Sequence, residues 1–178
     1  TNQVIQGDCL VVMKDIADKS IDMILCDLPY GTTACKWDTI IPFEPLWKEY
    51  KRIIKDNGAI VLTASQPFTS ALVMSNVKMF KYEWIWHKSI PSGAMSAKYQ
   101  PMKAHENILI FGKGKTNFNP IKEERSKNTH LITEKKRTYK SNSEHNNFNA
   151  LIGEQEEKRY PTTVKLFGNV SRWDSIHP

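Results

Sequence analysis

Short apolar runs alternate along the chain with longer stretches in which apolar residues recur every three or four positions. The apolar runs predict buried strands at 22–26, 59–64 and 106–111, and alternating aromatic and polar residues predict another strand at 82–87. The helical spacing predicts helices at 8–17, 43–55 and 66–77. Alternation of strand and helix indicates an α/β fold with a mostly parallel sheet and helices on both faces.

Weaker signals complete this outline. Residues 1–5 are expected to form a short strand or a sheet edge, and Asn57-Gly58 is the expected end of the second helix. The segment 89–104 is rich in Gly, Pro and Lys, which predicts a mobile loop. With 178 residues, 40% of them hydrophobic, the chain is long enough for one globular domain with a core.

The first strand ends in the tetrapeptide Asp27-Leu28-Pro29-Tyr30, and Gly31 follows at once. In an open α/β sheet, ligands bind at the carboxyl ends of the strands. The strand therefore brings a carboxylate, a backbone carbonyl and an aromatic ring to the rim of the sheet. These groups suit a flat ring that carries an amine, held by its edge and by its face.

The tetrapeptide resembles the Asp-Pro-Pro-Tyr catalytic motif of S-adenosylmethionine-dependent DNA amino-methyltransferases, with Leu28 in place of the first proline. Other segments resemble the same family in order: Gly7-Asp8-Cys9-Leu10, Trp37-Asp38, Gly58-Ala59-Ile60-Val61-Leu62, Trp84-Ile85-Trp86-His87-Lys88, the segment 105–113, Tyr160-Pro161-Thr162-Thr163 and His177-Pro178. The resemblance covers residues 7–113 and 160–178, and it is to the class whose catalytic motif precedes the cofactor motif. It implies a Rossmann-like methyltransferase sheet whose last two strands form an antiparallel hairpin.

The resemblance implies a role for each residue of the tetrapeptide. The Asp27 carboxylate and the Leu28 carbonyl would accept the two amine protons of the target base, Pro29 would lock the backbone, and Tyr30 would stack on the base. The base must be flipped out of double-stranded DNA. An Asp in first place favours adenine, because cytosine-amine enzymes more often begin this motif with Ser. The reaction needs no metal, and the five histidines show no metal-ligand spacing.

The resemblance also implies cofactor contacts at Asp8, Cys9 and Asp27 and at His177 and Pro178, although Asp8 suits a plain helix cap equally well. A glycine-rich cofactor turn is absent from the sequence. We therefore expect the catalytic and target-binding half of a methyltransferase, incomplete at its C-terminus and weak or inactive alone. A truncated product, the ordered part of a longer protein, a homodimer and a second polypeptide that completes the fold all stay open.

The net charge of +6 is concentrated in one region. Residues 113–140 hold nine Lys/Arg and three acidic residues, which is the typical footprint of a phosphate-backbone partner. Together with residues near the predicted strand ends, this region gives the candidate DNA contacts: Lys36, Trp37, Lys88, Lys98, Lys135, Lys136 and Arg137. The predicted organisation is a catalytic core at 1–113, a basic target-recognition insertion at 114–159 and a return to the core at 160–178.

The remaining features set the context. Three cysteines without metal spacing suit a reducing cytoplasm, and no apolar run approaches the ~20 residues that span a bilayer. The family resemblance implies a bacterial or phage-encoded protein in a restriction-modification setting. The favoured function is methylation of an adenine amine in a specific DNA sequence. The alternatives are a cytosine-amine methyltransferase, methylation of RNA or of an amide, and a DNA-binding remnant without turnover.

Overall fold

The computed structural model describes residues 2–124 and 158–167. The chain divides into two compact units. The first contains the residues up to 118 and from 163 onward, and the second spans 119–162. In the second unit the described residues form a short antiparallel pair, β5 (Glu123–Glu124) with β6 (Lys158–Arg159).

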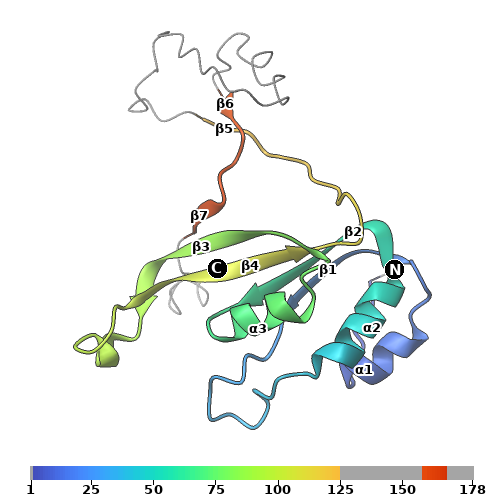
Figure 1. The fold of residues 1–178 in the computed structure, drawn as a ribbon, viewed down its shortest axis with the longest axis horizontal. Helices are drawn as coiled ribbons and strands as arrows, with labels where there is room; N and C mark the ends of the chain where they lie inside the picture. Colours follow the sequence, from blue (N-terminus) through green and yellow to red (C-terminus); the bar gives the residue numbers. More distant parts are fainter. Residues whose placement is uncertain (1, 125–157, 168–178) are drawn as a thin grey trace, which may run out of the picture. The chain divides into compact units, whose positions relative to one another are not determined.

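The first unit contains every larger element of the described chain (Figure 1). Its helices are α1 (Cys9–Val12), α2 (Phe43–Ile53) and α3 (Phe68–Ser75), with 3₁₀ turns η1 (Met13–Asp15) and η2 (Ala94–Ser96). Its strands are β1 (Ile21–Asp27), β2 (Ile54–Ala64), β3 (Phe80–Ser92), β4 (Lys103–Phe111) and β7 (Val164–Phe167).

The five strands form one mixed sheet in the order β1-β2-β4-β3-β7. β1 is parallel to β2 and β3 is parallel to β7, whereas β4 is antiparallel to both β2 and β3. The predicted antiparallel hairpin is therefore confirmed as β3–β4. The prediction of a mostly parallel sheet is wrong, because the returning strand β4 inserts between β2 and β3 and adds two antiparallel pairings.

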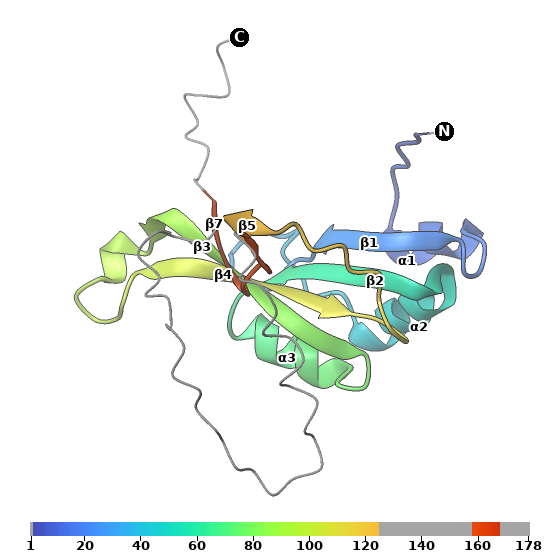
Figure 2. The same cartoon turned by 90° about the horizontal axis from the view of Figure 1, so that it is seen from above.

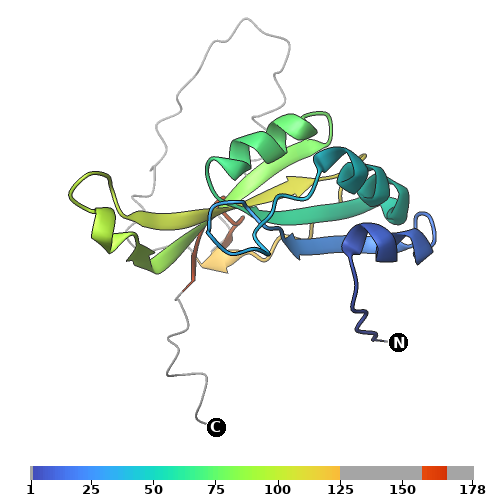
Figure 3. The same cartoon turned by 90° about the horizontal axis from the view of Figure 1, so that it is seen from below.

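The described helices pack on one face of this sheet (Figures 1 and 3). Leu46 of α2 and Leu72 of α3 are fully buried, as are Leu62 of β2 and Phe111 of β4. Figure 2 looks onto the opposite face, which carries no described helix. The expectation of helices on both faces is therefore not met within residues 2–124 and 158–167.

Several predicted boundaries shift. Residues 2–5 form no strand in the structure. The second helix ends at Ile53, because Ile54 turns to an extended conformation and pairs with Ile21, so Asn57-Gly58 lies inside β2. The predicted loop 89–104 is shorter, because Ser92 pairs with Lys103 and extends the hairpin on both strands.

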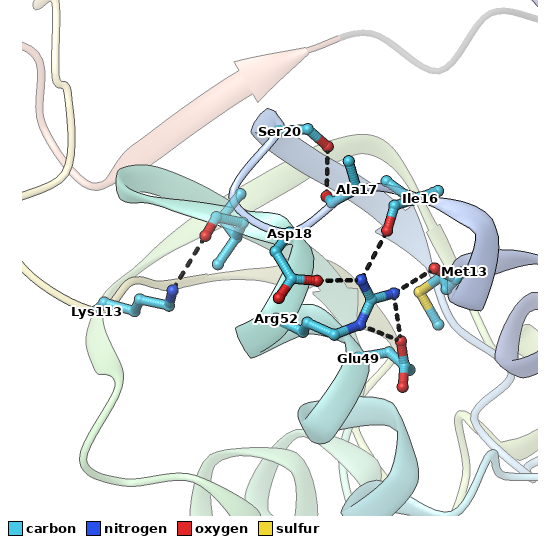
Figure 4. Close-up of polar contacts among 9 residues, drawn as sticks. Met13, Ile16, Ala17, Asp18, Ser20, Glu49, Arg52 and Lys113 are labelled. Atoms are coloured by element: carbon cyan, nitrogen blue, oxygen red, sulfur yellow. Dashed lines mark hydrogen bonds and ion pairs between the residues drawn. The ribbon is translucent and has the colours of Figure 1, made fainter.

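Arg52, in the last turn of α2, ties that helix to the segment that leads into β1 (Figure 4). Its guanidinium donates to the carbonyls of Met13 and Ile16 at 2.6 and 2.7 Å. It also forms ion pairs with Asp18 at 2.6 Å and with Glu49 at 2.7 Å. All five N–H donors of the planar Arg52 guanidinium are thus used, and they hold α2 against the turn that precedes β1.

Among the described helices, none has the length and apolar character needed to cross a membrane.

Candidate active site

The site is built where β1 and β2 end side by side. Asp27 is the last residue of β1, and it lies opposite Thr63 of β2 in the parallel register. The Thr63 hydroxyl donates to Asp27 Oδ1. Tyr30 closes the group, since its hydroxyl lies 2.8 Å from both Asp27 Oδ1 and Thr63 Oγ1. Asp27 is exposed, so a fixed carboxylate faces solvent at the carboxyl end of the strand.

Both hydroxyl contacts fall on the same carboxylate oxygen. Within the described part of the chain, Asp27 Oδ2 accepts no hydrogen bond. One oxygen is therefore used to orient the carboxylate, and the other is left as an acceptor for a donor from outside the chain.

Tyr30 is half-buried and its hydroxyl stays protonated. Burial raises the pKa of Tyr30 far above its usual range, and the nearby Asp27 charge raises it further. One face of its ring stacks on Phe68 of α3, with ring centroids 5.3 Å apart and an interplanar angle of 24°. Tyr30 therefore acts as a donor to Asp27 and is held between the strand ends and α3.

Leu28 gives the motif a hydrophobic anchor. Its side chain is 5% exposed and belongs to the main core, although Asp27 directly before it and Gly31 three residues after it are exposed. The backbone is thus pinned between the carboxylate and Pro29 by a buried side chain. This is a different kind of restraint from the ring that a proline at position 28 would supply.

The loop after the motif is organised by Asp38, which is 8% exposed. Its Oδ1 accepts the N–H of Gly31 at 2.8 Å, and its Oδ2 accepts those of Thr32 and Thr33 at 2.9 and 2.7 Å. The Thr33 side chain, followed by these backbone hydrogen bonds, lowers the pKa of Asp38 to about 2. At the outer part of this loop, Trp37 is 73% exposed.

A second polar pair lies near the motif, on β3 and β4. Lys88 forms an ion pair with Glu106, and both side chains are mostly buried, with exposed fractions of 17% and 22%. The Lys88 ammonium also lies 5.3 Å from the centre of the Trp86 ring. Glu106 acts electrostatically on Tyr30 and helps to raise its pKa, which relates the pair to the site. Lys88 is thus a paired residue and not a solvated strand end.

The predicted cofactor residues Asp8 and Cys9 stand at the start of α1. Asp8 Oδ1 accepts the N–H of Leu10 at 2.8 Å, so Asp8 is the N-cap of this helix. Cys9 is exposed and lies within electrostatic range of Cys26 on β1. The helix start therefore lies beside the strand that carries Asp27, and the cap leaves the second Asp8 oxygen for other donors.

The other predicted residues divide by position. Lys36 and Lys98 are exposed, the first in the loop before α2 and the second in the turn of the β3–β4 hairpin. Five fall outside the described residues: Lys135, Lys136, Arg137, His177 and Pro178. No group of three potential metal ligands occurs among residues 2–124 and 158–167.

Sequence reasoning missed two residues of the site. Thr63 follows the apolar residues of its strand and has no distinguishing feature in the sequence. Only the register between β1 and β2 places it opposite Asp27. The Trp37-Asp38 pair indicates no role for Asp38, because its three amide donors converge only when the loop closes.

Comparison with known proteins decides the family. A model of the DNA methylase family, which covers enzymes of the N6 and N4 type, matches residues 21–176. The chain belongs to this family. The resemblance found in the sequence is thereby confirmed at the level of the family.

Individual relatives are distant. The chain is 28% identical over 142 residues to the type II methyltransferase M.HinfI of Haemophilus influenzae, and 27% identical over 126 residues to M1.MboII of Moraxella bovis. These matches cover 65% and 64% of this chain but 39% and 47% of the relatives. The chain thus spans less than half the length of these two enzymes.

The fold is similar to that of solved methyltransferases. The crystal structure of the M1.HpyAVI–SAM complex superposes with a TM-score of 0.50 at 19% identity, covering 72% of this chain and 64% of the other. A second M1.HpyAVI structure gives a TM-score of 0.50 at 22% identity. At these identities the likeness supports the α/β fold with its mixed sheet.

Proposed function

We propose that the intact protein transfers a methyl group from S-adenosylmethionine to the exocyclic amine of adenine in a specific DNA sequence. The observation that carries the proposal is the exposed Asp27 carboxylate, oriented by Thr63 and Tyr30 at the carboxyl end of β1. Membership in the DNA methylase family and the type II methyltransferases among the relatives support it.

The chemistry follows from the weak nucleophilicity of a base amine, whose lone pair is delocalised into the ring. Asp27 Oδ2 would accept one amine proton and the Leu28 carbonyl the other, so that the nitrogen becomes more tetrahedral and its lone pair points out of the ring. Tyr30 would stack on the base with the ring face opposite Phe68. Positioning of the amine carries much of the rate in this arrangement.

S-Adenosylmethionine, when bound, supplies the activated methyl group. Two exposed carboxylates fit such a ligand, since Asp8 retains a free oxygen beside its cap and carboxylates accept from amine and hydroxyl groups. Asp8, Cys9 and Asp27 are the proposed contacts within the described residues. His177 and Pro178 complete the proposed set. The M1.HpyAVI structure, a complex with SAM, is consistent with this choice of cofactor.

The proposed DNA partner is double-stranded with the target adenine flipped out. Exposed Lys36, Trp37 and Lys98 lie in loops that could reach a backbone, and the basic residues at 135–137 add charge. The division into a core at 1–113, a recognition insertion at 114–159 and a return at 160–178 stays a prediction. A homodimer or a second chain that completes the site is likewise a proposal.

The deciding experiment is Asp27→Ala in the intact protein, with DNA methylation and DNA affinity measured together. We expect methylation to fall at least about 1000-fold, since a group that acts in the transition state is lost, while DNA affinity changes less than about threefold. Asp22→Ala is the matched control, because Asp22 is an exposed carboxylate on the same strand. Unchanged methylation in Asp27→Ala would refute the proposed role.

The modified base is identified separately, by mass spectrometry of nucleosides from methylated DNA. N6-methyladenine is the expected product. N4-methylcytosine would overturn the choice of base and leave the role of Asp27 intact. An intact protein that binds DNA and S-adenosylmethionine without methylating any base would favour the DNA-binding remnant.

A further inference from the structure

Leu28 is the position of the catalytic motif at which this chain lacks the ring that fixes φ in the family motif. Pro29 fixes its own φ and restricts Leu28 before it to extended conformations. The family motif has a second proline at position 28, and this chain has leucine. The φ angle of Leu28, whose carbonyl takes part in the proposed function, is therefore restrained by its buried side chain and not by a ring.

The other side of the motif is held by an unusual anchor. Gly31 has φ +67°, and a Cβ there would come within 2.9 Å of Ile40, so the chain turns sharply directly after Tyr30. The Gly31 N–H donates to Asp38 Oδ1 at 2.8 Å, which fixes the plane of the Tyr30–Gly31 peptide. The anchor is strong because a carboxylate is the acceptor.

The anchor is itself built to stay in place. Asp38 Oδ2 accepts the next two amides, from Thr32 and Thr33, so one side chain holds three consecutive N–H groups. The Asp38 N–H donates in turn to the Cys35 carbonyl at 3.0 Å. A carboxylate that is 8% exposed and accepts three backbone N–H groups holds the loop from 31 to 38 closed.

We propose that Asp38 is a positioning residue for methyl transfer, whose carboxylate supplies from the Gly31 side the restraint that leucine at position 28 omits. This inference rests on the proposed function. It assigns to Asp38 no contact with the base or the cofactor. It predicts that the need for Asp38 depends on which residue stands at position 28.

The test is a double-mutant cycle in the intact protein with Asp38→Asn and Leu28→Pro, followed by single-turnover methylation at saturating DNA and cofactor. Asn keeps the shape but loses the charge and one acceptor oxygen, and we expect the rate to fall about 10- to 100-fold. Leu28→Pro should then be at least about fivefold more favourable to the rate in the Asp38→Asn background than in the unsubstituted protein.

Leu28→Ala is the matched control, because it removes the same buried side chain without adding a ring. We expect it to show no such rescue. A role of Asp38 in stability alone would lower the rate in proportion to folded protein, which thermal unfolding measures, and would give no preference for proline. Equal effects of Leu28→Pro in both backgrounds, or an unchanged rate in Asp38→Asn, would overturn the inference.

Two provisions keep the result decisive. If Asp38→Asn does not fold, Thr33→Val takes its place in the cycle, because it removes the hydroxyl that helps to lower the pKa of Asp38 and leaves the three backbone donors in place. If Asp27→Ala leaves methylation intact, the proposed function fails and this inference fails with it. If Asp27→Ala abolishes methylation while the cycle shows no coupling, only the role of Asp38 fails.

Discussion

Thr63 of β2 faces Asp27 of β1 across the parallel register, and its hydroxyl donates to the carboxylate that we propose as the amine acceptor. The same hydroxyl oxygen lies 2.8 Å from the Tyr30 hydroxyl. A single threonine thus connects both polar side chains of the motif. Its own strand has no other part in the proposed chemistry.

Thr63→Val should slow methyl transfer by about 10- to 100-fold, because a hydrogen bond to a charged group is lost and the carboxylate is freer to rotate. Valine has nearly the same shape, so packing changes little. Single-turnover rates at saturating DNA measure the effect. Thr63→Ser keeps the hydroxyl and should retain most of the rate. An unchanged rate in Thr63→Val, or a loss in Thr63→Ser as large as that in Thr63→Val, would contradict a specific role of the hydroxyl.

The positions of the strands and of the motif were predictable because their signals are local, but the burial predicted for the first strand is wrong, since Met23 and Leu25 of β1 are exposed. Met23-Ile24-Leu25-Cys26 is an unbroken apolar run, and Pro29 and Gly31 mark where it must end. Helix α2 was likewise visible from its apolar stripe, although its end at Ile53 was not. Ile54 leaves the helix because it pairs with Ile21 of β1, and the local sequence does not indicate this pairing.

The relations between elements were not predictable in the same way. The insertion of β4 between β2 and β3 depends on which pairing buries Leu109 and Phe111, so the sheet became mixed. The contact of Asp27 with Thr63 follows from the register between β1 and β2, and the hydrogen bonds from three amides to Asp38 follow from closure of the loop. Both are tertiary effects on residues whose types alone suggested nothing specific.

Tyr50 predicts a particular loss of stability at alkaline pH. It is 5% exposed, and burial, followed by the nearby Cys26, raises its pKa well above the ordinary value of 10.0. Between these two pKa values only the unfolded chain releases the proton. The stabilisation is therefore fully present below pH 10 and is lost as the pH rises toward the folded pKa.

The measurement is urea unfolding of the intact protein between pH 9.5 and about 11.5. Tyr50→Phe should lose stability less steeply with pH than the unsubstituted protein, by up to about 1.4 kcal/mol per pH unit. Lysines titrate in both proteins, so the difference isolates Tyr50. Tyr99→Phe, at a tyrosine that is 90% exposed, serves as the control. Parallel pH profiles for Tyr50→Phe and the unsubstituted protein would contradict the assignment.

Arg52 should be needed for the fold and not for the chemistry. Arg52→Ala removes the guanidinium donors from the carbonyls of Met13 and Ile16 and separates α2 from the turn before β1. We expect a lower thermal midpoint and an unchanged methylation rate per folded molecule. Lys51→Ala, at the exposed neighbouring position, should leave the midpoint where it is. A midpoint that responds equally to both changes would mean that the Arg52 contacts contribute nothing specific.

The basic segment should be visible in the salt dependence of DNA binding. Neutralising Lys135, Lys136 and Arg137 to Gln should weaken binding and reduce the slope of log affinity against log salt by up to about 2.7, because each phosphate contact contributes about 0.9. The comparison variant changes three exposed lysines elsewhere, Lys14, Lys48 and Lys51. It removes the same net charge, so a general field effect would alter both slopes equally. A slope that changes only in the first variant identifies residues 135–137 as phosphate contacts.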